Sequence, residues 1–368
     1  MIDRIEFSNY KIFKNKQIIN LKPITVFFGK NNTGKSAIMK LPVLISESLK
    51  GQPVKWSYTI NNNSSDIVEL GKSFEDLIFN KNKIGSLDFL FEKAEKYISC
   101  TYNEKEGFLE VETNGTLLNE LGYIKSLKDI PQSQNFNFEI DFIDSIRIES
   151  ESSYYYQKES FDTIGVKGQN AYQILIEDFL NGGILLKLVS NWYRENFEGW
   201  RLEVVENKNL TGNDYELVIV KNGTPVNLKQ TGQGIQQVLP LVVRAFLKCK
   251  EQTKIIIQEP ETHLHPGAHG NLAELFINSF ITDSNKSYLI ESHSENFILR
   301  LRALIANQKL SQKDFALYYV DFIEEKGESI IREIEIDEDG NIKNDDWPEG
   351  IFNETLDEIE KIIEGQNL

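Results

Sequence analysis

The stretch Gly29-Lys30-Asn31-Asn32-Thr33-Gly34-Lys35-Ser36 decides the fold of this chain. It matches the pattern G-x-x-x-x-G-K-[ST], which forms a phosphate-binding loop when a strand precedes it and a helix follows it. Residues 24–28 are a short apolar run typical of a buried parallel strand, and residues 36–41 begin a helical pattern. The stretch is therefore predicted to be a P-loop rather than an incidental glycine-rich turn.

The residues of this loop have different expected tasks. Gly29 and Gly34 allow backbone conformations closed to other residues, so that successive N–H groups and the helix N-terminus face phosphate oxygens. Lys35 is expected to meet the β- and γ-phosphates, and the Ser36 hydroxyl to ligate Mg²⁺. The predicted ligand is ATP with Mg²⁺, bound by Gly29, Lys30, Asn31, Asn32, Thr33, Gly34, Lys35 and Ser36.

The composition predicts a globular, cytoplasmic protein. The chain has 368 residues, of which 40% are hydrophobic, enough for a sizeable core. No segment approaches the roughly 20 apolar residues of a membrane helix, and no apolar signal-peptide core is evident, so no membrane contact is expected. Cys100 and Cys249 are far apart and predict neither a disulfide framework nor a cysteine metal site.

The net charge of −16 is unevenly distributed. Residues 1–40 carry eight Lys or Arg against two acidic residues, whereas residues 321–368 carry 17 acidic residues against four basic ones. Nonspecific affinity for nucleic acid comes mainly from neutralising phosphates, so the net charge does not indicate a nucleic-acid partner, and any such contact would be local. The acidic C-terminal segment is expected to be a solvated face rather than a metal site.

A second motif lies at residues 254–266, where an apolar run ends in Gln258-Glu259-Pro260. It is typical of a Walker B strand, in which the first polar position supports Mg²⁺ and the second orients or deprotonates the attacking water. Glu259 is predicted to be that catalytic carboxylate. Gln258 would support Mg²⁺ through an uncharged amide, so metal binding is expected to be weaker. Taken alone, the segment could equally be a buried strand with an acidic turn.

A third motif follows the apolar run at residues 287–290, which is succeeded by Glu291-Ser292-His293-Ser294. His293 would lie at the tip of this strand. Because ligands of open parallel sheets bind at the carboxyl ends of the strands, residues 29–36, Glu259 and His293 are predicted to converge on one site. A packed core histidine is the alternative interpretation of His293.

All four histidines lie at or near this predicted site, which raises the alternative of a zinc centre. His263 and His265 alternate as ligands can, but neither a cysteine nor a third ligand at a conventional spacing accompanies them. We therefore do not expect a zinc site.

The order of these motifs resembles that of the ABC-type ATPase heads of SMC-like and overcoming-lysogenization-defect (OLD) proteins, over nearly the whole chain. The resemblance implies an α/β P-loop NTPase with a mixed central sheet, an N-terminal antiparallel β subdomain and an inserted α+β lobe. Residues 5–14 look like the family's first strand and turn, where Tyr10 and Lys11 are candidate nucleotide contacts. Residues 230–240 resemble its degenerate signature, with Gly232, Gly234 and Gln237 as candidate contacts to ATP.

In such families two heads meet head to tail, and the signature of one closes over the γ-phosphate held by the other. Switch histidines of these families occupy the place of His293, so the resemblance implies that His293 is a γ-phosphate sensor and hydrogen-bond donor. The resemblance therefore implies a dimer, or a higher oligomer, assembled around ATP. Residues 70–77, 291–302 and 347–352 also resemble a bacterial ATPase subfamily with an uncharacterised C-terminal domain. Many relatives have an acid where Gln258 stands, and Glu47 occupies the expected glutamine-loop position, where it is a weak metal candidate.

The predicted domain organisation is discontinuous. Residues 1–70 and 227–320 would form the ATPase core, residues 71–226 an inserted lobe, and residues 321–368 an acidic extension. Helices are expected at 171–179, 184–193 and 353–363, and strands at 316–321 and 330–336; residues 154–156 are expected to be a strand or an aromatic patch. Neither the coiled-coil arm of SMC proteins nor the nuclease module of OLD proteins is evident.

Three functions remain open at this point. The favoured one is a slow ATP hydrolase whose ATP-bound dimer controls a partner or effector protein, by family analogy in defence against phage. The second is an ATP-bound scaffold without useful hydrolysis. The third is a DNA-associated protein of the SMC or OLD kind, which would bind DNA through residues 1–40 in a salt-sensitive way.

Overall fold

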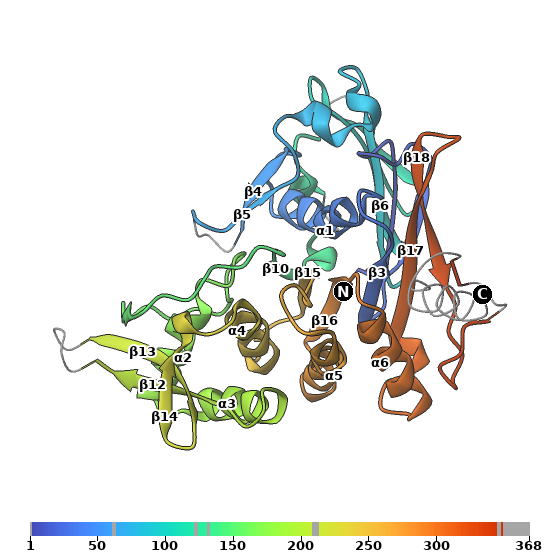
Figure 1. The fold of residues 1–368 in the computed structure, drawn as a ribbon. Helices are drawn as coiled ribbons and strands as arrows, with labels where there is room; N and C mark the ends of the chain where they lie inside the picture. The colour runs from blue at the N-terminus through green and yellow to red at the C-terminus, as the bar shows by residue number, and fades with distance from the viewer. Residues whose placement is uncertain are drawn as a thin grey trace, which may run out of the picture.

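A six-stranded, mostly parallel sheet forms the centre of the computed structural model, which describes residues 2–60, 64–120, 124–130, 133–207, 213–343 and 347–348 (Figure 1). Its strands, in spatial order, are β10 (Glu139–Ile143), β15 (Thr253–Gln258), β16 (Lys286–Glu291), β3 (Ile24–Phe28), β17 (Phe315–Ile323) and β18 (Glu328–Ile334). Neighbours pair in parallel except β17 and β18, which form an antiparallel hairpin. The predicted α/β class is confirmed.

The central strands are apolar throughout because both faces of the sheet are covered. Along β3, Ile24, Val26 and Phe28 point into one hydrophobic core, whereas Phe27 points into a second core on the other face. The same alternation holds along β15, where Ile255 and Ile257 enter the first core and Ile256 enters the second. The two cores pack against opposite faces of the sheet. Its edges and the ends of its strands can therefore contribute to other functions.

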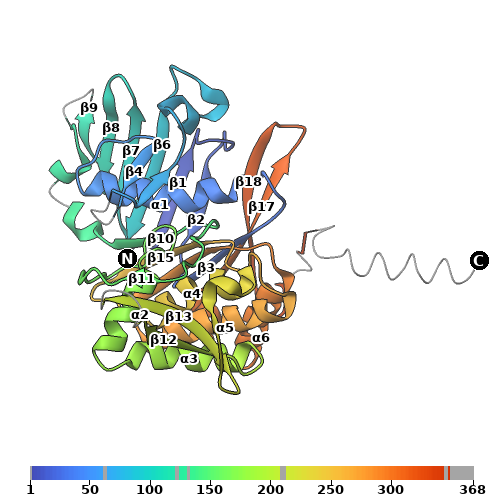
Figure 2. The same ribbon diagram turned by 60° about the vertical axis from the view of Figure 1, so that its left-hand side comes forward.

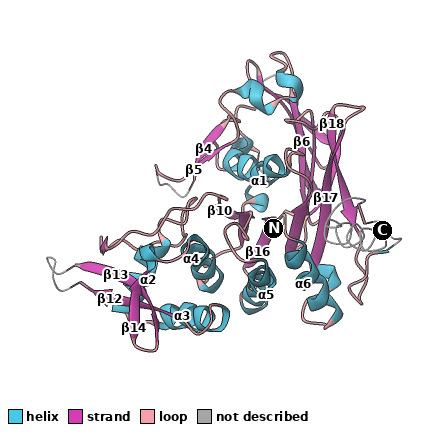
Figure 3. Ribbon diagram, in the orientation of Figure 1, coloured by secondary structure: helices cyan, strands magenta, loops and turns pink. Residues whose placement is uncertain are grey.

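Helices cover the two faces unequally (Figure 3). On one face α1 (Lys35–Leu49), the helix that follows the P-loop, contacts β15 and β16. On the other face lie α4 (Gln233–Phe246), α5 (Pro266–Thr282) and α6 (Glu295–Ala306) (Figure 1). No helix among the described residues is both long enough and apolar enough to cross a membrane.

A second six-stranded sheet is wholly antiparallel and lies beyond α1 (Figure 2). Its strands, in order, are β2 (Gln17–Asn20), β1 (Arg4–Ser8), β6 (Leu87–Lys93), β7 (Lys96–Asn103), β8 (Gly107–Thr113) and β9 (Thr116–Glu120). Alternate residues of β6 and β7 are buried, the pattern of a sheet with one covered face. The expected N-terminal antiparallel subdomain is confirmed.

A smaller lobe joins helices and short strands. It contains α2 (Ala171–Leu180), α3 (Ile184–Asn196), β11 (Tyr154–Tyr155), β12 (Arg201–Glu206), β13 (Asp214–Lys221) and β14 (Thr224–Asn227). Both predicted helices are confirmed, and Tyr154 stacks on Tyr172 of α2 at 4.6 Å between ring centroids, which explains the aromatic run as a packed strand. The hairpin of β4 (Ser57–Thr59) and β5 (Ile67–Glu69) leads to the site described below. Short 3-10 helices span Phe74–Leu77, Phe79–Lys81, Leu127–Asp129, Ser133–Phe136, Leu228–Gln230 and Gln312–Asp314.

The predicted domain boundaries stay a prediction, but strand pairing connects the three parts. From the predicted lobe, β6 pairs with β1 and β10 pairs with β15 in the central sheet. The strands expected at 316–321 and 330–336 are present as β17 and β18, so the central sheet extends beyond residue 320. These pairings join residues that are far apart in sequence, so domain boundaries written as sequence ranges do not describe them. The helix expected at 353–363 lies outside the described residues.

Candidate functional site

The P-loop connects the end of β3 to the start of α1, and its two glycines are sterically required. Gly29 has φ +148°, and a Cβ placed on it would lie 2.3 Å from the Val320 carbonyl oxygen. Gly34, the N-cap of α1, has φ +97°, and its Cβ would lie 2.7 Å from a methyl carbon of Ile12. Only glycine allows these approaches together with positive φ. The backbone thus forms the cradle that a phosphate needs at a helix N-terminus.

Lys35 folds back over this loop. Its ammonium Nζ donates to the carbonyl oxygens of Gly29, at 3.0 Å, and of Lys30, and the residue is 3% exposed. Burial lowers the pKa of Lys35, while the nearby carboxylates of Glu291 and Glu259 oppose that change. A buried cation held only by carbonyl oxygens gains from an anion, so the position suits a phosphate ligand.

Glu291, the last residue of β16, is the site residue that the sequence analysis did not single out. Its carboxylate is 2% exposed and accepts two hydrogen bonds, from Ser36 Oγ to Oε1 at 2.9 Å and from Gln258 Nε2 to Oε2 at 2.9 Å. Burial raises the pKa of Glu291, and the hydrogen bonds and the charge of Lys35 act against that rise. Because β16 lies between β15 and β3, its tip stands between the Walker B strand and the P-loop.

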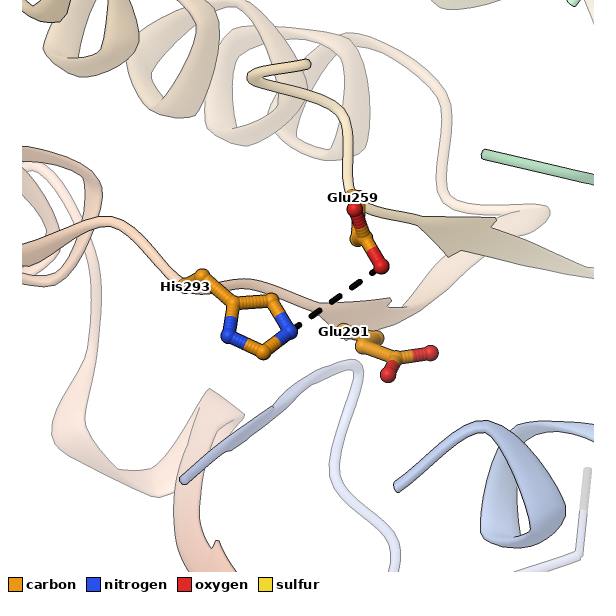
Figure 4. Close-up of side chains that lie close together, drawn as sticks. All are labelled: Glu259, Glu291 and His293. Carbon is orange, nitrogen blue, oxygen red and sulfur yellow. Dashed lines mark ion pairs between the residues drawn. The ribbon is translucent and has the colours of Figure 1, made fainter. Parts of the chain in front are cut away.

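Glu259 and His293 face each other across this tip (Figure 4). His293 Nε2 lies 4.0 Å from Glu259 Oε1, and the two side chains are 32% and 40% exposed. Oxygen or nitrogen atoms of Glu259, Glu291 and His293 all lie within 4.8 Å of one another. Burial, followed by the charge of Lys35, lowers the pKa of His293, so its imidazole is neutral near pH 7 and can donate one hydrogen bond.

The turn after Glu259 is held by a buried carboxyl group, Glu261. Its Oε1 accepts hydrogen bonds from the backbone N–H of His293 and from Ser292 Oγ, the latter at 3.0 Å. Burial raises the pKa of Glu261 to about 7. Glu259 itself has φ +43° and His263 has φ +68°, both uncommon for residues other than glycine. Such strain persists where surrounding contacts fix the backbone, and here the Glu259 N–H donates to the Glu291 carbonyl oxygen at 2.9 Å and the Leu264 N–H to the Glu261 carbonyl oxygen at 2.9 Å.

A cavity of about 1580 Å³ contains these groups. Of the predicted site residues, its walls include Lys11, Asn31, Asn32, Gly34, Lys35, Ser36, Glu259 and His293. Glu291, Glu261 and the segment Glu69–Lys72 line it as well, and so do Phe322 and Gly327 of the β17–β18 hairpin. The three predicted strand tips therefore line one cavity, together with further residues that no single motif indicated.

Two predicted site residues lie elsewhere for clear physical reasons. Tyr10 is fully buried, and its hydroxyl donates to the Ala37 carbonyl oxygen at 3.1 Å, so it braces α1 instead of contacting a ligand. Glu47 lies on α1 about three helical turns beyond Ser36, where it pairs with Lys50 at 3.3 Å. Glu47 is therefore not placed to reach a metal at the P-loop, and this expectation is corrected.

The remaining P-loop and Walker B residues act through their backbone or through neighbours. Thr33 is 3% exposed and its hydroxyl donates to the Lys30 carbonyl oxygen at 3.0 Å, which closes the loop. The Lys30 side chain is exposed and does not line the cavity. Gln258 is 4% exposed and meets the site through Glu291.

The signature residues at the start of α4 lie outside this cavity. Gly232 is exposed, and a Cβ placed on it would meet no atom within 4 Å. A Cβ on Gly234 would lie 2.4 Å from the His263 carbonyl oxygen, so that glycine serves a contact within the chain. Gln237 is 6% exposed, and its Nε2 donates to the Arg147 carbonyl oxygen at 3.2 Å. Gln237 is thus a buried brace, and of the three only Gly232 is presented to an approaching molecule.

The histidines beyond His293 have local structural partners. His265 accepts a hydrogen bond from the Gly267 N–H at 3.1 Å and caps α5. His269 contacts Ser294 Oγ at 2.7 Å and the Leu264 carbonyl oxygen at 3.1 Å, which links the Walker B turn to the His293 loop. His263 is exposed on the same turn.

Comparison with known protein families gives two matches. Residues 39–300 match a family described as "AAA domain, putative AbiEii toxin, Type IV TA system". Residues 310–362 match a family described as "Protein of unknown function (DUF3696)". The search of curated proteins gave no match.

Comparison with solved structures identifies the fold. A crystal structure of an SMC head bound to the C-terminal winged-helix domain of ScpA is similar with a TM-score of 0.54 and 14% identity, over 91% of this chain and 98% of the other. The SMC head with an extended coiled coil from Pyrococcus furiosus, bound to the C-terminal domain of ScpA, gives 0.50 and 13% over the whole of both chains. At these identities the likeness shows the fold, which is that of an SMC-like ABC ATPase head.

Proposed function

We propose that this chain, which belongs to the AAA-domain family that includes the putative AbiEii toxin of type IV toxin–antitoxin systems, is an ATP-dependent switch that hydrolyses ATP slowly and dimerises head to tail around it. The observation that carries the proposal is the single cavity lined by Lys35, Ser36, Glu259 and His293. These residues come from three separate strand tips, and their chemistry is that of phosphate binding and water activation.

Each group in the cavity has a task in binding. The backbone from Gly29 to Gly34 would cradle the β- and γ-phosphates, and Lys35 would exchange its loop carbonyls for phosphate oxygens. Ser36 would hold Mg²⁺, which supplies neutralisation of phosphate charge when bound. The residues present fit this ligand, because the loop has the required glycines and a buried lysine next to buried carboxylates.

Hydrolysis would depend on Glu259. Its half-exposed carboxylate is placed to orient a water molecule and accept its proton, while His293, neutral near pH 7, donates a hydrogen bond to charge that develops nearby. A slow rate is expected because Gln258 carries no charge for the metal.

The size of the cavity supports a composite site. Its volume of about 1580 Å³ exceeds the roughly 300–1,000 Å³ of ordinary ligand pockets, so ATP alone would leave one side open. The α4 N-terminus, with Gly232 exposed, lies outside this cavity and is available to cover that of a second copy. A dimer formed this way would exist only with ATP bound and could therefore control an effector protein; a role in antiviral defence is part of this proposal.

The test is the solution mass of Glu259→Gln with and without ATP, measured by light scattering on a size-exclusion column, together with phosphate release. We expect Glu259→Gln to bind ATP, release no phosphate and shift to the mass of a dimer with ATP. Wild-type protein should return to the monomer as ATP is consumed.

Other outcomes distinguish the remaining hypotheses. A mass that does not depend on ATP would exclude the head-to-tail model. Equal phosphate release by wild type and Glu259→Gln would favour a scaffold without useful hydrolysis. The matched control is Glu69→Gln, since Glu69 lines the same cavity from β5 but lies on a different wall.

A further inference from the structure

The carboxylate of Glu291 is buried at the nucleotide site, where its hydrogen-bond donors are neutral. It is 2% exposed, and among the described residues its two oxygens accept hydrogen bonds from two neutral donors, the Ser36 hydroxyl and the Gln258 amide. Removing a carboxylate from water costs several kcal/mol unless opposite charge or strong hydrogen bonds replace the water. Lys35 offers part of that charge, but its ammonium group donates to the carbonyl oxygens of Gly29 and Lys30.

The position of Glu291 follows from strand order. In the parallel register, Glu291 is opposite Gln258 on one side and Phe27 on the other. Because β16 separates the Walker B strand from the strand that leads into the P-loop, the tip of β16 is closer to Ser36 in the sheet than the tip of β15. A side chain from this tip can therefore reach the hydroxyl expected to ligate Mg²⁺, and the hydrogen bond of 2.9 Å shows that Glu291 does.

Gln258 is oriented as a partner of Glu291 and not as a substitute for it. Its amide nitrogen, which cannot ligate a cation, points at Glu291 Oε2. The bond holds one carboxylate oxygen in place and leaves Oε1 directed at Ser36. Hard divalent cations prefer oxygen ligands, and a negatively charged carboxylate stabilises the bound cation more than a neutral ligand does.

We propose that Glu291 supplies the carboxylate for the divalent cation of this ATPase, with Gln258 as the residue that positions it. The charge usually provided by the Walker B strand is thus provided by the next strand, at the Ser36 hydroxyl. This inference rests on the proposed ATP-binding function. It replaces the expectation that Gln258 itself supports the metal.

The experiment measures ATP affinity with a fluorescent ATP analogue, first in EDTA and then at rising Mg²⁺. We expect Glu291→Gln to raise the Mg²⁺ concentration needed for tight binding by about 10- to 100-fold. Affinity in EDTA should stay unchanged or improve, since one negative charge near the phosphates is removed. A second readout, the electron paramagnetic resonance signal of bound Mn²⁺ with ATP, should weaken in parallel.

Two further variants keep the test decisive. The exchange Gln258→Glu with Glu291→Gln moves the carboxylate to the Walker B strand and should recover most of the Mg²⁺ dependence. Glu47→Gln is the matched control, because Glu47 is also a buried carboxylate on a segment next to the site but pairs with Lys50. It should behave as wild type.

The failures are separable. If wild type does not bind the analogue under any condition, the proposed function is wrong. If wild type responds to Mg²⁺ and Glu291→Gln responds at the same concentration, the inference about Glu291 is wrong. An equal loss of affinity in EDTA and in Mg²⁺ would show that Glu291 has only a structural role, which also overturns the inference.

Discussion

Charged side chains lie toward both ends of the strands of the central sheet, but the two groups differ in how these charges are paired. Toward the amino ends, Asp141 of β10 and Arg244 of α4 form an ion pair whose side chains are 0% and 2% exposed. At the carboxyl ends, Glu259 and Glu291 lie together beside Lys35, which bonds to backbone carbonyls instead. The first end thus contains an ion pair, whereas at the second end the lysine donates its hydrogen bonds to carbonyl oxygens and not to the carboxylates beside it.

At the amino end, further hydrogen bonds surround the ion pair. Arg244 also donates to the Leu247 carbonyl oxygen at 3.1 Å, and Lys286 donates to the Ala245 carbonyl oxygen at 2.7 Å and to Ser279 Oγ at 3.0 Å. These bonds join α4, α5 and β16 and serve the fold. The difference teaches that burial of charge does not by itself identify a ligand site; among the described residues, a buried carboxylate without an ion pair is the stronger indication.

The largest expected effect comes from breaking the buried ion pair between Asp141 and Arg244. Arg244→Met leaves the Asp141 carboxylate buried without its partner and should lower the free energy of unfolding by about 3–5 kcal/mol, measured by urea denaturation. The double variant Asp141→Leu with Arg244→Met should recover most of that loss, because no charge is left buried. If single and double variants are equally unstable, packing rather than charge dominates here.

Next in size is the buried amine Lys254 on β15, where burial lowers the pKa from 10.5 to about 8. Between these values the unfolded chain binds the extra proton, so stability rises with pH through this window. Lys254→Met should therefore be more stable than wild type by up to about 3 kcal/mol below pH 8. The advantage should shrink from pH 8 to 10.5 and vanish above it. An advantage independent of pH would contradict this explanation.

The third prediction concerns the carboxyl end. Lys35→Ala removes the ammonium group at the P-loop and should weaken ATP binding by about 10- to 100-fold, as expected for a charge-assisted hydrogen bond, while the thermal midpoint changes little. Lys30→Ala in the same loop is the matched control, since its side chain is exposed and only its carbonyl takes part. Comparable losses in both variants would mean that the loop attracts ATP only through its overall charge.

The smallest expected effect tests the corrected position of Tyr10. Tyr10→Phe removes the hydrogen bond to the Ala37 carbonyl oxygen and should cost about 1 kcal/mol in unfolding free energy. ATP affinity should remain that of wild type because Tyr10 does not line the cavity. A selective loss of ATP affinity would show that Tyr10 contributes to ATP binding and would contradict this assignment.

Much of the site could be predicted from local patterns. The P-loop depends on its glycines, on Lys35 and on Ser36, which all lie within residues 29–36. Both its presence and its place between β3 and α1 could therefore be predicted from the sequence. The same holds for the strands that end just before Glu259 and His293, since an apolar run followed by polar residues predicts a strand tip. The convergence of these tips followed from the geometry of parallel sheets.

The errors came from residues whose role depends on distant parts of the chain. Tyr10 was a candidate nucleotide contact because residues 5–14 resemble the family's first strand and turn, but its hydroxyl bonds to the Ala37 carbonyl oxygen of α1. Gln237 matched a family motif, yet its side chain bonds to the Arg147 carbonyl oxygen, 90 residues away. Glu47 matched the expected glutamine-loop position in sequence but lies about three turns beyond Ser36 on α1.

The sequence by itself determined the class of ligand, because the backbone conformations and the lysine that a phosphate needs are all local to residues 29–36. Tertiary structure alone decided which carboxylate stands beside Ser36. That choice depends on β16 being inserted between β15 and β3, an order that no local pattern records, since a strand's neighbours are set by packing of the whole sheet. Glu291 followed an ordinary apolar strand in the sequence and became a site residue only through that order.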